Sequence, residues 1–577
     1  MSIEQDVSDL VKILALKNAV EHDGKAQAES VISKLLGSRP DKRGTIKTLI
    51  PEIRAIVQSI NLMPLSDQKS LLDKMAPEET AKKPVEETGV RLPPLEGAVM
   101  GQVVTRFPPE PNGYPHIGHA KAAIIDEEYA RMYQGKLILR FDDTNPLKEK
   151  LEYYDAIKEG LDWLGVKPDI VKNTSDDISL IQQYGRKLVE LDGAYVCTCS
   201  QETMHDLRAK GVACECRRDP SEALTRLEKL FNGSYEQNQA IIRFKGDMAD
   251  LNTAMRDPAL FRIIEGQHPK LGSKIRVWPT YDFAAPIEDS LDGVTHAMRT
   301  KEYELRNALY FAILDRLDLR KPTMIEFSRL EFEGVPVSKR KIRPLIDDGT
   351  IKDWDDPRLP TLSAFRRRGF VPEAIRKFVI SLGITLAETK PPFEALEAYN
   401  RKIIDPLSMR LFFVKDPVEL YVQEAADLDV VLKNHPTDTA LGSRTVKASD
   451  RFYVSGDDAA GLKINDEIRL IELYNVKITR IECQEGKLSL TATPAGSEIK
   501  QSMPKIQWVS KQDIFDLRVL IPKQLYVGEQ YNTNSLEVVK GVAESFVSGF
   551  KPGQVVQFVR FGFCRIDGNN TAIFTHR

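Results

Sequence analysis

The sequence of 577 residues lacks the features of membrane, secreted and disordered proteins. It has no apolar run near the roughly 20 residues that a membrane-spanning helix needs, and it starts without the basic and apolar blocks of a signal peptide. Six cysteines in so long a chain are too few for a disulfide scaffold. Hydrophobic residues make up 42% and charged residues 29%, as in ordinary globular proteins. We therefore expect a soluble, cytoplasmic protein.

Two further absences limit how the chain can bind its ligands. The net charge is only −3, so any contact with a nucleic acid has to depend on a local basic surface. No G-x-x-x-x-G-K-[ST] sequence is present, so a phosphate site has to come from another motif. The length is too great for one hydrophobic core and indicates about three to five domains.

Such a motif begins near residue 103, where a short apolar run leads into the sequence TRFPPEPNGYPHIGH (105–119). Its four prolines keep the connection open before a helix begins. Apolar residues then recur at helical spacing, and residues 137–141 (LILRF) have the pattern of a buried strand. In a strand–turn–helix–strand unit, the helix N-terminus offers unpaired N–H groups where a polyphosphate can bind.

Two histidines stand at the start of this helix. His116 and His119 are three residues apart and face the same way, and Gly118 between them has no side chain to block a flat ring. Together the three residues predict a nucleotide-binding site. An isolated H-x-x-H sequence is more often plain surface polarity, so the flanking residues have to decide.

Further candidates lie at the ends of predicted strands. Residues 139–146 (LRFDDTNP) end a strand in two carboxylates, at the edge of a parallel sheet where ligands bind. Such a pair can instead cap the next helix. Arg106 lies on the neighbouring predicted strand, close enough to reach the same ligand as Asp142.

Later segments supply three more kinds of candidate. Residues 277–299 contain an aromatic strand and a helix that can be plain core, with Tyr281 near the start and Arg299 at the end. Residues 335–341 (VPVSKRK) form a basic cluster around Ser338 and Lys339, for which a solvated surface or an RNA contact is the ordinary interpretation. Three consecutive arginines, residues 366–368, suit contact with RNA phosphates.

Four of the six cysteines form two C-x-C pairs about fifteen residues apart. If a loop brings the pairs together, four thiolates can surround a zinc ion as a structural site requires, and four sulfur ligands leave no open position for catalysis. Four free thiols are the alternative, and His205 can replace one ligand. The residues concerned are Cys197, Cys199, Cys214 and Cys216.

The flanking residues resolve several of these choices. Residues 105–121 resemble, nearly residue for residue, the HIGH signature of class I aminoacyl-tRNA synthetases in the version shared by glutaminyl-tRNA synthetases and archaeal and eukaryotic glutamyl-tRNA synthetases. Residues 335–341 resemble the second signature, KMSKS, in the SKRK form of that subfamily, without its first lysine. Residues 353–378 also match. The resemblance covers roughly residue 101 to the C-terminus and leaves the first 95 residues unexplained.

The resemblance implies roles for the candidate residues. In ATP binding it implies His116, Gly118, His119, Ser338 and Lys339, with the two histidines and the lysine stabilising the charge that develops on the phosphates. In glutamate binding it implies Asp142 for the α-ammonium group, Tyr281 beside the side chain, and Arg106 and Arg299.

Arg299 decides the expected substrate. Glutaminyl-tRNA synthetases characteristically have a small uncharged residue at this position, and glutamyl-tRNA synthetases have arginine. A guanidinium donates a planar fork of hydrogen bonds to a γ-carboxylate, whereas an amide offers one acceptor and an NH2 group. A buried arginine without a counter-charge costs several kcal/mol, which disfavours glutamine. A surface arginine in a salt bridge is the alternative.

The resemblance also implies the architecture of an α/β class I synthetase, with a Rossmann-like catalytic domain, an inserted acceptor-binding domain and C-terminal all-β anticodon-binding barrels. The helical N-terminal extension is predicted from periodicity instead, since residues 1 to about 75 have two apolar faces at helical spacing, one of Val31, Ile32, Leu35 and Leu36 and one of Ile53, Ile56, Val57 and Ile60. Short alternating apolar runs after residue 405 agree with the barrels. The predicted boundaries are 1–95 for the helical extension with its linker (76–94), 96–195 and 276–345 for the two halves of the catalytic fold, 196–275 for the insertion with the cysteines, 346–404 for a helical connector, and 405–577 for two barrels.

The expected function is that of an archaeal or eukaryotic-type glutamyl-tRNA synthetase, with ATP as a substrate, Mg²⁺, a structural Zn²⁺, and tRNA(Glu) as a partner. The sequence leaves open whether tRNA(Gln) is also charged. The helical extension either docks a protein or the tRNA, or is a solvated bundle. The alternatives are a glutaminyl-tRNA synthetase, an inactive tRNA-binding protein, and a small-molecule adenylyltransferase, which shares the first motif but has no need of barrels.

Overall fold

The computed structural model describes residues 5–21, 24–39, 45–75, 92–218, 222–388, 390–500 and 503–577. Contacts divide the chain into two compact units, Met1–Gly89 and Val90–Arg577, which are treated separately below. The predicted linker lies mostly outside the described residues, since 76–91 are not described. The other predicted domain boundaries stay predictions. No helix of the described residues is long and apolar enough to cross a bilayer.

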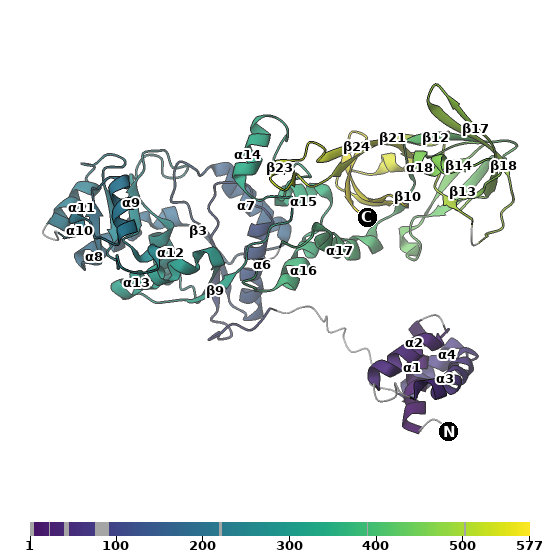
Figure 1. Ribbon diagram of the computed structural model, residues 1–577, viewed down its shortest axis with the longest axis horizontal. Helices are drawn as coiled ribbons and strands as arrows, with labels where there is room; N and C mark the ends of the chain where they lie inside the picture. Colours follow the sequence, from purple (N-terminus) through teal and green to yellow (C-terminus); the bar gives the residue numbers. More distant parts are fainter. Residues whose placement is uncertain are drawn as a thin grey trace. The chain divides into compact units, whose positions relative to one another are not determined.

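The first unit is helical, as its sequence periodicity predicts. Its described residues form α1 (Gln5–Glu21), α2 (Ala28–Ser38), α3 (Ile46–Asn61) and α4 (Leu65–Met75) (Figure 1). The two predicted apolar faces turn inward, since Val31, Leu35, Ile53 and Val57 are at most 4% exposed. A buried amide helps to close the bundle: Gln68 Nε2 donates to the backbone oxygens of Gly24 and Ile60.

The second unit is built around a parallel sheet. Strand β1 (Val104–Phe107) pairs with β2 (Lys136–Phe141), and β2 pairs with β3 (Ile170–Asn173). Helix α6 (Ile117–Met132) connects β1 to β2, and α7 (Leu151–Leu164) leads on towards β3 (Figure 1). The apolar residues of α6 lie in the same hydrophobic core as Leu137 and Leu139 of β2. The predicted strand–turn–helix–strand unit is present.

Two later strands extend this sheet on the other side of β1. Strand β8 (His296–Thr300) pairs in parallel with β9 (Thr323–Phe327). The Thr295 N–H donates to the Val104 carbonyl (2.9 Å), which places the start of β8 beside β1. The spatial order of the strands is therefore β3-β2-β1-β8-β9. The chain adds β2 and β3 on one side of β1, and β8 and β9 on the other, so the order of strand addition reverses between β1 and β8. In doubly wound sheets a ligand crevice forms at the carboxyl ends of the two strands at this switch point.

A second, antiparallel sheet lies between these two halves in the sequence. It has the order β4 (Ala194–Cys197), β5 (Ile241–Phe244), β6 (Ala259–Ile263) and β7 (Val277–Pro279). Helices α8 (Ile178–Glu190), α9 (Gln201–Lys210), α10 (Glu215–Arg218) and α11 (Ala223–Phe231) accompany it. Strand β7, which the predicted boundaries assign to the second catalytic half, belongs to this sheet, and the parallel sheet resumes only at β8.

Helices α12 (Tyr281–Leu291) and α13 (Asn307–Leu317) flank β8 in sequence. Helix α14 (Lys339–Asp347) follows β9. The helical stretch before the β-rich region then contains α15 (Leu362–Arg368), α16 (Pro372–Leu382) and α17 (Phe393–Ile404). The core beneath α6 extends into these helices through Phe365, Phe378 and Leu396.

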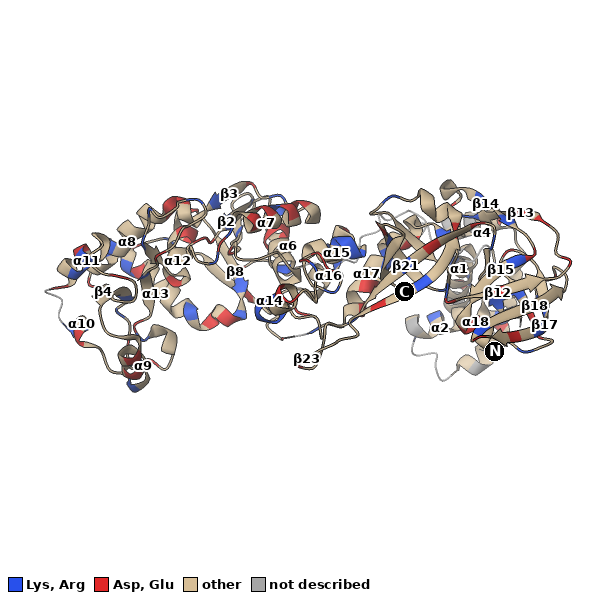
Figure 2. Cartoon of the chain, turned by 90° about the horizontal axis from the view of Figure 1, so that it is seen from above, with Lys and Arg blue, Asp and Glu red and all other residues tan. Residues whose placement is uncertain are grey.

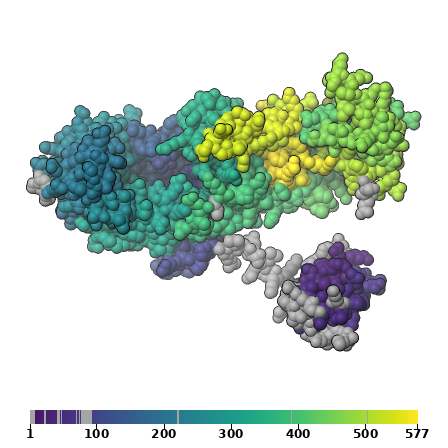
Figure 3. Space-filling model, viewed as in Figure 1, coloured from purple at the N-terminus to yellow at the C-terminus, as the bar shows by residue number. Residues whose placement is uncertain are grey.

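The C-terminal part is mainly β, as its texture predicts, with one short α-helix, α18 (Gly456–Ala460), among its described residues; its green and yellow surface is continuous in Figure 3. One seven-stranded sheet has the order β19 (Lys505–Ile506), β16 (Glu467–Leu470), β17 (Asn475–Gln484), β18 (Lys487–Pro494), β12 (Pro417–Val422), β15 (Arg451–Ser455) and β20 (Val509–Ser510). The other has the order β10-β25-β26-β27-β21-β24-β11, in which β25 is Val555–Phe558 and β26 is Gly562–Gly568. Its strands β10 (Arg410–Leu411) and β11 (Phe413–Lys415) precede the first sheet in the chain, and the rest follow it from β21 (Ile514–Pro522) to β27 (Thr571–His576). The first sheet is therefore nested inside the second along the chain.

A buried ion pair joins the outer seven-stranded sheet to a separate two-stranded sheet, β13 (Leu428–Lys433) with β14 (Ser443–Ala448). Arg444 of β14 (Ser443–Ala448) and Glu544 of β24 (Leu536–Glu544) have side chains only 3% and 2% exposed, and the guanidinium contacts both carboxylate oxygens. The same carboxylate accepts the Phe412 N–H (2.6 Å), and Asn434 Oδ1 accepts from Arg444 (3.0 Å). Because all of these polar groups are buried away from water, removing one of them leaves its partners without a hydrogen bond or a counter-charge.

Replacing Arg444→Ala should therefore destabilise the C-terminal part strongly. Removing one partner of a buried pair costs about 3–5 kcal/mol, because the other charge stays buried and unpaired. A thermal scan of the full chain should show a clearly lower midpoint. The control is Arg451→Ala, which removes an exposed pair with Glu419 and should leave the midpoint nearly unchanged. Equal effects of the two changes would contradict the structural role of Arg444.

Candidate functional site

The histidine turn lies at the carboxyl end of β1, at the switch point of the parallel sheet. His116 is the N-cap of α6, and His119 sits in the first turn of the helix. Two backbone hydrogen bonds fix this turn to the segment around the start of α15. The Ile117 N–H donates to the Pro360 carbonyl, and the Leu362 N–H donates to the Pro115 carbonyl. The match of residues 353–378 to the synthetase subfamily thus coincides with a structural support of the site.

Hydrogen bonds fix the tautomer of both histidines. The Nδ1 atom of His116 accepts from the Gly118 N–H (3.1 Å), and the Nδ1 atom of His119 accepts from the His116 N–H (3.2 Å). Burial lowers the pKa of His119 to about 4 and lowers the pKa of His116 well below its usual value. Both rings are therefore neutral near pH 7 and carry their proton on Nε2. They can act as N–H donors to a phosphate, not as cations.

Two glycines of this turn are required by close packing. A Cβ on Gly118 would lie 2.9 Å from the His116 ring, so the glycine makes room for the histidine itself. A Cβ on Gly113 would lie 2.6 Å from the Lys339 side chain, so the lysine crosses directly over the turn. Gly113 and Lys339 are 226 residues apart in the sequence, so the two signature segments meet here across the crevice.

The crevice beside these residues encloses a cavity of about 220 Å³, which is lined by His116, His119, Val337, Lys339, Trp354 and Thr361, among others. Lys339 is the first residue of α14, and Ser338 is its N-cap. Burial and the neighbouring cations Arg343, Lys148 and Lys150 lower the pKa of Lys339, although Glu110 opposes them. An ammonium group among like charges, at a helix N-terminus, is well placed to receive an anion.

The two strand-end carboxylates have different environments. Asp142 accepts from Thr174 Oγ1 (3.1 Å) and lies 3.3 Å from Arg140 Nε, with its side chain 13% exposed. Asp143 is fully buried and accepts from Tyr154 Oη and from the N–H and hydroxyl of Ser175. Asp143 therefore binds the segment before α8, which is close to the capping interpretation, and Asp142 is the carboxylate nearer to solvent.

Arg106 lies deeper than its sequence position indicates. It is 1% exposed, and it donates from Nε to Asp289 Oδ1 (3.0 Å) and from Nη1 to the Met298 carbonyl (2.6 Å). Arg140 shares the same Asp289 oxygen at 2.9 Å. Arg106 thus ties β1 to α12 and β8. The partners Asp289 and Arg140 were not among the predicted site residues, because nothing in the local sequence marks them as paired across the sheet.

Arg299 ends β8 on the other side of the switch point and is 6% exposed. Its Nη2 donates to the Tyr303 carbonyl (3.3 Å), and its guanidinium carbon lies 5.4 Å and 5.8 Å from the ring centres of Tyr310 and Tyr303. Its Nε is buried without a partner. Among the described residues, no carboxylate forms an ion pair with Arg299. The alternative considered from the sequence, a surface arginine in a salt bridge, is thus not found among the described residues.

Tyr281 connects these groups. It begins α12, its ring lies 5.0 Å from that of Tyr303, and burial raises its pKa to about 12, with the charges of Arg106, Arg299 and Asp142 also acting on it. Tyr281 therefore lies within electrostatic range of the other three residues predicted for the amino acid, which are two buried cations and one carboxylate.

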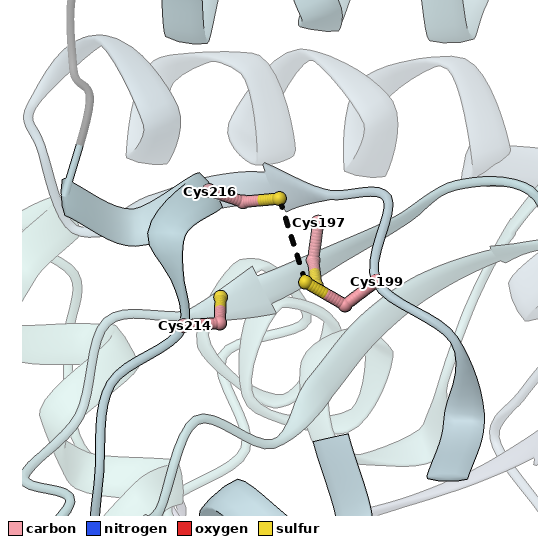
Figure 4. Close-up of side chains that lie close together, drawn as sticks. All are labelled: Cys197, Cys199, Cys214 and Cys216. Atoms are coloured by element: carbon pink, nitrogen blue, oxygen red, sulfur yellow. Dashed lines mark hydrogen bonds between the residues drawn. The ribbon is translucent and has the colours of Figure 1, made fainter. Parts of the chain in front are cut away.

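The four cysteines of the C-x-C pairs converge, and Figure 4 shows their sulfur atoms turned towards one another. All four Sγ atoms lie within 4.8 Å of one another, and Cys199 and Cys216 are 3.7 Å apart. Tetrahedral zinc with Zn–S bonds of about 2.3 Å needs sulfur atoms about 3.8 Å apart, so this donor set fits zinc. His205 is 84% exposed and is not part of the cluster.

The three arginines of α15 form ion pairs mainly with other residues of the protein. They belong to the blue region of this helix in Figure 2. Arg367 pairs with Asp355 and with Asp567 of the C-terminal sheet. Arg368 is 11% exposed and pairs with Glu397, so the expected phosphate contact does not fit this residue. Arg366 is 54% exposed and remains accessible to a phosphate. The triplet mainly fixes α15 to its neighbours.

Comparisons with known proteins agree with this geometry. Residues 102–406 match the family model "tRNA synthetases class I (E and Q), catalytic domain", and residues 408–493 and 505–567 match two models of the anticodon-binding domain of the same synthetases. The glutamate–tRNA ligase of Cenarchaeum symbiosum is 50% identical over 99% of this chain and 100% of its own length. Those of Nitrosopumilus maritimus (47%; 100% of both chains) and Pyrococcus furiosus (39%; 99% and 100%) are similar throughout.

The resemblance seen in the two signature segments therefore extends over the whole sequence, including the first 95 residues that it left unexplained. The catalytic model alone spans more than half of the chain. The chain belongs to the class I tRNA synthetases of the E and Q type.

Proposed function

We propose that this protein is a glutamate–tRNA ligase. It joins L-glutamate to ATP, giving glutamyl-adenylate and pyrophosphate, and then transfers the glutamyl group to the terminal adenosine of tRNA(Glu). The full-length relatives that bear this name support the activity. The observation that carries the choice of glutamate is Arg299, a buried guanidinium that has no carboxylate partner among the described residues.

The physical argument rests on the cost of that buried charge. A desolvated guanidinium costs several kcal/mol unless an anion neutralises it, and the aromatic rings of Tyr303 and Tyr310 compensate only part of this. The γ-carboxylate of glutamate supplies the missing charge and accepts two parallel hydrogen bonds. Glutamine leaves the charge unpaired, so the pocket favours glutamate.

In the activation step, an oxygen of the glutamate α-carboxylate attacks the α-phosphorus of ATP, and the bond to the β-phosphate oxygen breaks. His116 and His119 donate from Nε2 to the α-phosphate oxygens, where negative charge develops. Lys339 and the helix N-terminus after Ser338 neutralise the departing pyrophosphate. Bound Mg²⁺ would shield the same phosphates. The neutral histidines suit this role because they need no proton exchange with solvent.

The amino acid is held from both ends. Asp142 receives the α-ammonium group, Arg299 the γ-carboxylate, and Tyr281 packs beside the side chain. Arg106 is bound to Asp289 and Met298, so it supports the pocket wall and adds positive potential to it. This arrangement orients the α-carboxylate towards the histidine turn, which converts activation into a positioned reaction.

The remaining parts serve the tRNA. The nested sheets grip the anticodon, where single-stranded bases can be splayed and stacked. The insertion that carries the cysteines guides the acceptor end, and a zinc ion held by Cys197, Cys199, Cys214 and Cys216 stiffens it. The helical first unit docks a protein or the tRNA. The cytoplasm is the compartment, because translation takes place there.

Charging assays with separate tRNA(Glu) and tRNA(Gln) transcripts decide whether both are substrates.

Replacing Arg299→Cys should abolish most glutamate activation. Loss of a buried charge partner worth about 3–5 kcal/mol corresponds to a fall of about 150- to 4000-fold in kcat/KM for glutamate. ATP–pyrophosphate exchange, measured with tRNA present, reports this directly. The control is Arg316→Cys on the exposed side of α13, which should retain the wild-type rate. An Arg299→Cys enzyme with unchanged glutamate activation would contradict the assignment of Arg299 to the γ-carboxylate.

The histidine turn predicts an unusual pH profile. Replacing His119→Ala should lower the exchange rate by about 100-fold, as for loss of one oxyanion donor. Because the pKa of His119 is about 4, its ring stays neutral down to about pH 5. The ratio of wild-type to variant rates should therefore be constant between about pH 5.5 and 8. A ratio that collapses as the pH falls through about 6.5 would show that the ring titrates normally.

The cysteine cluster predicts one bound zinc per chain. Metal analysis of the purified full-length protein should find it, and Cys214→Ser should lose it together with a lower thermal midpoint. Cys483→Ser, which changes an exposed cysteine outside the cluster, should alter neither. Wild-type protein with full stability and no bound metal after purification in zinc would contradict the site.

A further inference from the structure

Lys121 is a buried cation that no step of the proposed reaction uses. It lies on α6 two residues after His119 and is only 2% exposed. No carboxylate of a described residue forms an ion pair with it. Its Nζ donates to the Ser328 carbonyl (2.6 Å) and lies 3.3 Å from the Ser328 hydroxyl, with the Phe327 ring centre 5.3 Å away. A lysine kept in such surroundings carries a desolvation cost that an apolar side chain would avoid.

Ser328 occupies a critical place in the chain. It follows directly after β9, and eleven residues later the chain reaches Lys339. Its N–H donates to the Thr385 carbonyl, and the residue is 1% exposed. A buried carbonyl at a strand end needs a donor, and Lys121 supplies it from the neighbouring helix. One bond thus joins the helix of the first signature to the strand that leads into the second.

The segment after Ser328 follows the same helix. A Cβ on Gly118 would lie 3.6 Å from the Leu330 carbonyl, so the backbone passes beside the histidine turn. Leu330 and Phe332 are buried in one core with Ile117. The Val337 N–H donates to the Glu331 carboxylate (3.2 Å), which joins the two ends of residues 331–337. The chain then reaches Lys339, whose side chain crosses over Gly113. The position of Lys339 is therefore set from its upstream end, and Lys121 makes the polar contact there.

We propose that Lys121 is a positioning residue: it fixes the carboxyl end of β9 to α6 and thereby aligns Lys339 with the phosphates held by His116 and His119. The inference rests on the proposed glutamate activation for its kinetic consequence, but the structural tether is independent of it. The polar contacts of Lys121 are with Ser328, which neither lines the cavity of the crevice nor is one of the four residues predicted for the amino acid. Its effect is therefore on catalysis and not on glutamate binding.

The kinetic test is Lys121→Met, which keeps the volume and removes the donor. Glutamate-dependent ATP–pyrophosphate exchange, with tRNA present, should show kcat lowered by about 10- to 100-fold, as expected for a displaced catalytic group. KM for glutamate should change by less than about 2-fold, because the pocket around Arg299 is untouched. Ser328→Ala keeps the carbonyl that accepts the shorter bond and should cost less than about 3-fold. Lys136→Met, at an exposed position on β2, is the matched control and should behave as wild type.

A second measurement tests the tether without relying on activity. Amide hydrogen exchange of Lys121→Met should be faster than wild type across residues 328–339 and unchanged in the C-terminal sheets. Lys136→Met should show no such change. If Lys121→Met does not fold, Lys121→Gln, which keeps a shorter donor, is judged by the same two measurements.

The outcomes separate the two proposals. Wild-type protein without glutamate-dependent exchange, together with faster amide exchange in Lys121→Met, overturns the proposed function and keeps the tether. Active wild type with an unchanged kcat or unchanged amide exchange in the variant overturns the inference about Lys121. A variant in which kcat and glutamate KM are unchanged per folded molecule, with only a lower thermal midpoint, also overturns it, since that result describes a structural lysine alone.

Discussion

The switch point of the parallel sheet is the constraint on which the site depends. Because β1 and β8 lie side by side at the point where the strand order reverses, a ligand crevice forms at their carboxyl ends. His116 follows β1, and Arg299 ends β8. The nucleotide end and the amino-acid end of the pocket are therefore held at a fixed separation by backbone pairing. Positioned chemistry of this kind needs such a rigid frame more than it needs reactive side chains.

Around this crevice the protein accepts several buried charges. Some are neutralised inside the fold, as Arg106 and Arg140 are by Asp289. Lys121 is held by the Ser328 carbonyl, whereas Arg299 has no carboxylate partner among the described residues. The difference is informative, because a structural charge is best paired within the protein, whereas a charge that waits for a ligand has to remain unpaired until the ligand binds. Burial also keeps both histidines neutral, so they act as hydrogen-bond donors. The arginines in the same buried environment remain cations.

Much of this arrangement was accessible from the sequence. The buried strand at 137–141, the neighbouring histidines and the two C-x-C pairs are local patterns, and local patterns survive folding because their geometry depends on nearby residues. Pairings over long distances were not accessible. Asp289 lies 183 residues from Arg106, and Asp567 lies 200 residues from Arg367, so composition and periodicity could not reveal that these arginines are already bound. Lys121 resembled any polar residue of an amphipathic helix until its partner was seen.

The nesting of one β-sheet within the other has a consequence for how the chain folds. Phe413 pairs with Ala543, so closing the outer sheet joins segments 130 residues apart, and the entropy of such a loop opposes the pairing. The inner sheet uses only the intervening chain. Once it has formed, it brings the two ends of that chain together and replaces a long flexible loop by a short rigid one. We therefore expect an ordered assembly in which the inner module acts as a template for the outer one.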